Sequence, residues 1–88
     1  MDNRECEIVR DRCEHLIAQT LRSLVSLRHQ AVDCLADNAD APGDLMSALL
    51  HDLADAQDSQ QRLLALLVTA RNDLSTEIAA HANAARTA

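Results

Sequence analysis

A single proline and a single glycine stand side by side near the midpoint of this 88-residue chain, at Pro42-Gly43. Proline cannot continue the interior of a helix and glycine tolerates a reversal, so the pair predicts one tight turn. Both flanking segments are rich in Leu and Ala, lack aromatic residues and contain only scattered β-branched residues, a composition that favours helix over strand. We therefore predict an all-α fold, an antiparallel two-helix hairpin of the coiled-coil type, as a single domain over residues 1–88.

The boundaries of the predicted helices follow from the turn and from the helix-breaking residues around it. Asp40 and Asp44 are both suitable N-caps, so the start of the second helix stays open within residues 41–44. The expected elements are a first helix over about residues 4–38, a turn over 39–43, a second helix over about 44–83 and a frayed end over 84–88.

The first predicted helix carries apolar residues at steps of three or four, with one stutter after Thr20. This stripe consists of Cys6, Val9, Cys13, Leu16, Thr20, Leu24, Leu27, Ala31 and Cys34. A second stripe lies beside it and consists of Ile17, Leu21, Val25, Val32 and Leu35. The two stripes together are wider than one partner helix can cover, which indicates that something else covers the remainder.

The second predicted helix has a more regular seam, with steps of three and four in strict alternation over about five and a half heptads. Its members are Met46, Leu49, Leu53, Ala56, Gln60, Leu63, Leu67, Ala70, Leu74, Glu77, His81 and Ala84. In the antiparallel register Gln60 is expected near Ser23 and Ser26, forming a polar layer of the kind that fixes register.

Residues 63–68 are apolar all the way round the predicted helix, and Leu50, Leu64 and Ile78 extend the excess along one flank. A helix surrounded by water lacks such a pattern, so we expect burial on more than one side, by a second copy or by another protein. The candidate partner-binding residues are Ile17, Leu21, Val25, Val32, Leu50, Leu64, Leu66, Val68 and Ile78.

Cysteine and histidine spacing does not favour a metal site. Cys6 and Cys13 are seven residues apart, about 10.5 Å along a helix axis, which is too far for a shared zinc ion or a disulfide. Cys34 lies further along the same helix, so we expect reduced cysteines that pack in the seam, with an interchain disulfide as the alternative. No histidine pair has metal-binding spacing. We therefore expect no catalytic, cofactor-binding or metal-binding residues.

The formal net charge of −6 comes from eight Arg, no Lys and fourteen acidic residues. Nucleic acids and anionic membranes both require a cationic surface, so neither is an expected partner. The longest apolar run is too short to span a bilayer, and the first residues contain no signal-like apolar segment. We expect a cytoplasmic protein without membrane insertion.

An acidic helical hairpin of this size, with excess apolar surface over Arg4 to His81, resembles the small co-chaperones of bacterial type III secretion needle subunits. The resemblance is one of shape and pattern. It implies a chain that binds a tetratricopeptide-like secretion chaperone and helps to keep the needle subunit from polymerising in the cytosol. The alternative is self-association, in which two hairpins form a four-helix bundle with a structural or regulatory role.

The segment from Leu63 to Arg71, continuing to Glu77-Ile78-Ala79, is similar to the long helix of all-helical chorismate mutases. Those enzymes need further cationic residues, including a lysine after this segment, and this chain has no lysine. A dianionic substrate requires such cationic partners. We therefore expect a protein that is not an enzyme.

Overall fold

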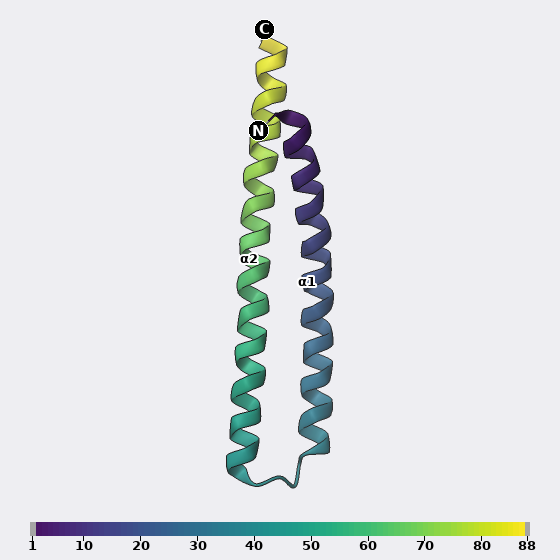
Figure 1. Cartoon of the computed structure of the whole chain (residues 1–88), viewed down its shortest axis with the longest axis vertical. Coiled ribbons are helices and arrows are strands. Elements are labelled where there is room, and N and C mark those ends of the chain that lie inside the picture. Colours follow the sequence, from purple (N-terminus) through teal and green to yellow (C-terminus); the bar gives the residue numbers. More distant parts are fainter. Residues whose placement is uncertain (1, 88) are drawn as a thin grey trace.

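The protein is a pair of long antiparallel helices joined by a short connection (Figure 1). The computed structural model describes residues 2–87, in which α1 spans Asn3–Asp37 and α2 spans Gly43–Thr87. The molecule measures 70 × 16 × 15 Å, and its radius of gyration is 19.9 Å, against about 12 Å for a compact domain of this length. The predicted all-α hairpin is confirmed.

Hydrogen bonds from side chains and turn residues close both ends of α1. The side chain of Asp2 accepts a hydrogen bond of 2.8 Å from the backbone N–H of Glu5, as an N-cap residue does. At the other end, the backbone N–H and the side-chain amide of Asn38 both donate to the carbonyl of Cys34. These bonds satisfy helix-end groups that would otherwise lack partners.

The connection itself occupies residues 38–42, and Gly43, the residue after it, does not make the reversal. The backbone N–H of Ala41 donates to the carbonyl of Asn38, and that of Met46 donates to the carbonyl of Pro42. Pro42 therefore holds the N-cap position of α2, which neither Asp40 nor Asp44 occupies. Gly43 is the first residue of α2 and has no positive φ, so our expectation that glycine supplies the reversal is wrong.

The contact face of α1 is a strict heptad repeat with no stutter. Its least exposed residues are Cys6, Arg10, Cys13, Ile17, Thr20, Leu24, Leu27, Ala31 and Cys34. The predicted seam placed Val9 and Leu16 there, but both are exposed, and the next residue along the chain takes each place. The predicted stutter in this helix is therefore wrong.

The contact face of α2 contains the stutter instead. Its partly buried residues at steps of three or four are Met46, Leu49, Leu53, Gln57, Gln60, Leu64, Leu67, Arg71, Leu74, Ile78 and His81. Two steps of four follow one another from Leu49 to Gln57, so every second later contact position lies one residue beyond its predicted place, while Gln60, Leu67, Leu74 and His81 keep theirs. Ala56, Leu63 and Glu77, predicted in the seam, are consequently exposed.

Little of the hairpin is buried. Only Cys6, Cys13, Ile17, Thr20 and Leu24 are buried in the described chain, all of them in α1. The hydroxyl of Thr20 donates to the carbonyl of Leu16 at 2.8 Å, so its burial leaves no hydroxyl unpaired. The accessible surface is 6461 Å², about 1,400 Å² more than the roughly 5,100 Å² of a compact monomer of this mass.

The last turns of α2 extend beyond the start of α1 (Figure 1). Residues 84–87, which we expected to fray, are helical, and residue 88 lies outside the described residues. Alanine has the highest helix propensity and makes up much of this segment. The hydroxyl of Thr87 also donates to the carbonyls of Asn83 and Ala84. Every residue from Ala82 to Thr87 is nevertheless exposed.

Candidate protein-interaction surface

The hairpin has two open sides, and the side that we call the first flank is apolar near the turn. Residues of α1 and α2 together line a hollow of about 460 Å³ on this side. Leu21 and Val25 lie seven residues before Arg28 and Val32, and so extend the same side along α1. The first flank consists of Leu21, Val25, Arg28, Val32 and Leu35 from α1 and Leu50 and Ala54 from α2.

Large apolar side chains on the first flank are exposed. Val32 is 66% exposed and Val25 53%, while Leu21 and Leu50 are each about half exposed. Beneath them, the floor of the hollow is formed by Leu27, Ala31, Leu53 and Gln57 of the two contact faces. The first flank is therefore an apolar lane supported by both helices, with Arg28 as its one charged residue.

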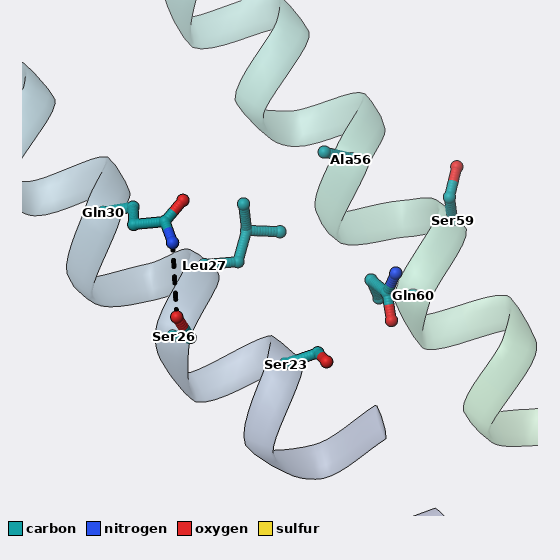
Figure 2. Close-up of a pocket in the computed structure, with 7 residues that line it drawn as sticks. All are labelled: Ser23, Ser26, Leu27, Gln30, Ala56, Ser59 and Gln60. Carbon is teal, nitrogen blue, oxygen red and sulfur yellow. Dashed lines mark hydrogen bonds between the residues drawn. The ribbon is translucent and has the colours of Figure 1, made fainter. Parts of the chain in front are cut away.

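The opposite side, the second flank, is polar near the turn. A hollow of about 390 Å³ is lined there by Ser23, Ser26, Leu27, Gln30, Ala56, Ser59 and Gln60. Figure 2 shows Leu27 pointing across toward α2, while Gln30 donates to the hydroxyl of Ser26 along α1. Ser23, Ser26 and Gln60 thus line one hollow, as the predicted polar layer required. Because this hollow lies on one side of the hairpin only, the two flanks differ chemically.

Further from the turn, the second flank becomes apolar. Leu16 lies seven residues before Ser23, while Leu63 and Leu66 lie seven residues after Ala56 and Ser59, so all three continue this side. Leu66 is 70% exposed, the most exposed large apolar side chain in the described chain. The hairpin therefore has two apolar patches, on opposite sides and at different distances from the turn.

The net negative charge of the molecule comes from the half that contains the turn. Residues 28–60, which we call the turn half, contain seven Asp and one Arg, a formal charge of −6. The remaining residues contain seven Arg and seven acidic residues, a formal charge of zero. All seven aspartates of the turn half are exposed: Asp33, Asp37, Asp40, Asp44, Asp52, Asp55 and Asp58.

The nine predicted partner-binding residues do not form one surface. Leu21, Val25, Val32 and Leu50 lie on the first flank, and Leu64 and Val68 border it but are partly buried. Leu66 lies on the second flank. Ile17 is buried against α2 and Ile78 is partly buried in the contact face, so their assignment to a free surface is wrong. The cause is the one-residue rotation of the contact faces.

Sequence analysis missed three residues of these surfaces. Leu16 and Leu63 were assigned to the seams but are exposed on the second flank, and Leu35, named as apolar, was not among the candidates. Each of the three lies seven residues from another flank residue. This spacing would have identified them once the contact face was known.

The cysteines are packing residues in the hairpin. All three lie on the continuous helix α1 and are free thiols, and Cys6 is only 1% exposed. Cys6 lines a small hollow with Asp73, Leu74 and Glu77. The carboxylate of Glu77 lies 3.5 Å from Nε2 of His81. Among residues 2–87 no group of three His, Cys, Asp or Glu side chains is arranged to hold a metal ion.

No protein-family model, curated protein or solved structure matches this chain. Within the described residues, neither helix has a stretch of sufficient length and apolarity to cross a bilayer.

Proposed function

We propose that this protein is a non-enzymatic interaction module that offers the first flank to another helical protein. The observation that carries the proposal is the apolar lane over both helices, in which Val32 is 66% exposed. Contiguous apolar surface of this kind marks an interaction site in monomeric proteins. The hairpin also exposes more surface than a compact monomer of its mass, so binding would complete a core that two helices alone leave thin.

Within this function, the more specific proposal is a cytoplasmic co-chaperone of a bacterial type III secretion needle subunit, with a tetratricopeptide-like chaperone as its partner. The resemblance to that family rests on chain length, hairpin shape, acidic charge and excess apolar surface. A chaperone built from helical pairs presents the kind of surface that the first flank fits, because helices pack well into apolar grooves.

Co-expression with a candidate needle-subunit chaperone tests this proposal. We expect the wild-type chain to co-purify in a defined complex, and Val32→Asp to abolish that complex because it places a charge in the apolar lane. The matched control is Leu66→Asp on the second flank, which should leave the complex intact. Circular dichroism should show equal helix content for both variants, and an undiminished complex with Val32→Asp would refute the role of the first flank.

Self-association is the second candidate function, and the uncharged part of the second flank favours it. Leu16, Leu63 and Leu66 lie outside the acidic turn half. Two copies could therefore meet there without bringing two negatively charged regions together. The excess surface of about 1,400 Å² exceeds the roughly 800 Å² per partner of a standard interface. Light scattering of the purified chain decides: a dimer that Leu66→Asp converts to monomer would support this candidate, and a wild-type monomer would exclude it.

A further inference from the structure

We infer that a second copy of this chain covers the second flank and that the two copies are antiparallel, with their turns at opposite ends of the dimer. This inference rests on self-association, the second candidate function, and adds the geometry of the assembly. It follows from the order of apolar, polar and acidic side chains along the second flank.

The apolar patch of the second flank spans both helices at one level of the hairpin. Two hollows that both helices line mark levels at which α1 and α2 meet, one containing Cys6 and Leu74 and the other Ser26 and Ser59. Leu16 lies midway between the two α1 residues, and Leu66 lies midway, to within one residue, between the two α2 residues. The exposed leucines at 16, 63 and 66 therefore gather at the same level.

The same side of the hairpin is acidic toward the turn. Three exposed aspartates lie seven residues from side chains that line the polar hollow, and so continue the second flank: Asp33, Asp37 and Asp52. The only Arg or Lys of the turn half is Arg28, which lines the hollow of the first flank instead. No Arg or Lys of the turn half therefore offsets these aspartates on the second flank.

These aspartates distinguish the two possible dimers. Two copies joined through the second flank by a two-fold axis have their turns either at the same end or at opposite ends. Turns at the same end would bring three carboxylates from each copy together, and like charges across an interface are unfavourable. An antiparallel dimer centred on Leu16 places Asp33 of the two copies about 50 Å apart along the helices. That separation is several Debye lengths, so their repulsion is screened.

A two-fold axis at the level of Leu66 also brings complementary regions together. Asp73 and Glu77 line the hollow beside Cys6 and lie about 10 to 16 Å beyond Leu66 along α2. The α2 residues of the polar hollow lie at similar distances on the other side of Leu66. In the antiparallel dimer, the two carboxylates of each copy therefore lie beside the partner's serine and glutamine side chains. Hydroxyls and amides can donate hydrogen bonds to carboxylates.

The overlap of the two copies is long enough for a stable dimer. Leu16 lies about 20 Å from Asn3 at the start of α1, so the paired hairpins would be in contact over about 40 Å. The excess surface of about 1,400 Å² exceeds the roughly 800 Å² per partner of a standard interface. The first flank lies on the opposite side of each hairpin and stays uncovered, so the dimer offers two such sites to other proteins.

Light scattering of the full-length chain and two matched variants test the interface. We expect the wild type to be a dimer. Leu66→Asn keeps the net charge and should raise the dimer dissociation constant at least about tenfold, because it places an amide in the apolar patch. Val32→Asn on the first flank is the control and should dimerise as the wild type does. Both residues are exposed, and circular dichroism checks that helix content is unchanged.

Disulfide cross-linking under mild oxidation tests the orientation. Leu66→Cys alone and Leu16→Cys alone should each form linked dimers, because the axis brings each position close to its own copy. Turns at the same end would instead place residue 66 opposite residue 16 of the partner, so only a mixture of the two variants would cross-link. The wild-type chain controls for the native thiols, of which Cys6 and Cys13 are buried and Cys34 is partly buried.

Each contrary outcome has a distinct meaning. A wild-type monomer would overturn both self-association and this inference, while the co-expression experiment judges the first flank separately. A dimer that cross-links only in the mixture would overturn the antiparallel arrangement and leave self-association intact. A dimer that Val32→Asn dissociates and Leu66→Asn does not would place the second copy on the first flank, and would also overturn the inference.

Discussion

At the scale of single residues, neighbouring apolar side chains have opposite surroundings in this hairpin. Ile17 is buried while Leu16 is exposed, and Leu64 is partly buried while Leu63 is exposed. Each pair is almost equal in hydrophobicity, so the transfer free energy of the side chains does not distinguish its members. What distinguishes them is the direction in which each Cβ points relative to the other helix.

This difference between positions predicts a measurable contrast in stability. Leu24 is 6% exposed and Leu66 is 70% exposed. We expect Leu24→Ala to lower the free energy of unfolding by about 2–3 kcal/mol, because it removes buried methyl groups and leaves a cavity. Leu66→Ala, the control, should change it by less than about 0.5 kcal/mol. Urea unfolding measures both, and similar losses for the two would contradict the assigned contact face.

At the scale of elements, α2 is longer than its partner and more weakly held along its length. No residue of α2 is fully buried, and the side chains from Ala82 to Thr87 are all exposed. The last turns of α2, which we call the overhang, extend beyond the start of α1 (Figure 1). Isolated helical turns are marginal in water because propagation adds little free energy per residue. The overhang is thus supported by its alanines and by continuity with the paired part of α2.

Truncation tests whether the overhang contributes less to stability than the paired part of α2 does. Removing residues 83–88 should change the free energy of unfolding by less than about 0.5 kcal/mol, because residues 83–87 are all exposed. Removing the chain from Leu74 onward should destabilise the hairpin strongly, since Leu74 and Ile78 are partly buried in the contact face. Circular dichroism during thermal unfolding compares the two truncated chains. A large loss from the shorter deletion would indicate that the overhang packs against α1.

At the scale of the whole molecule, shape and charge distribution act together. The extended form exposes apolar lanes that a compact domain would bury, and the net charge of −6 is concentrated in the turn half. Seven exposed aspartates within one half repel one another, and this repulsion favours states in which the two helices separate. The turn end therefore combines exposed apolar side chains with repulsion among its aspartates.

Salt should therefore stabilise the free hairpin. Raising NaCl from about 10 mM to about 200 mM shortens the screening length and weakens repulsion among the aspartates, so the thermal midpoint should rise. The double variant Asp37→Asn and Asp40→Asn should have a higher midpoint at low salt and a smaller response to NaCl. Thermal unfolding followed by circular dichroism measures both. A midpoint that falls with salt would contradict net repulsion in the turn half.

The sequence by itself determined the helical hairpin, the presence of one turn close to Pro42-Gly43, the row of cysteines and an apolar surface larger than one helix covers. These are local properties, set by helix propensity, by proline and by residue spacing. The sequence also identified four residues of the first flank, Leu21, Val25, Val32 and Leu50. Its predictions failed where either of two adjacent residues could face the other helix at the same spacing, as with Leu16 and Ile17 or Ala56 and Gln57.

Only the tertiary structure decided which residues face the partner helix and therefore which remain free. The contact face of α1 is continuous, whereas that of α2 shifts by one residue between Leu53 and Gln57. That shift places Leu64 in the contact face and leaves Leu63 outside it. The physical reason is that the rotation of a helix about its own axis is fixed by packing along both helices together, and no single residue pattern specifies it.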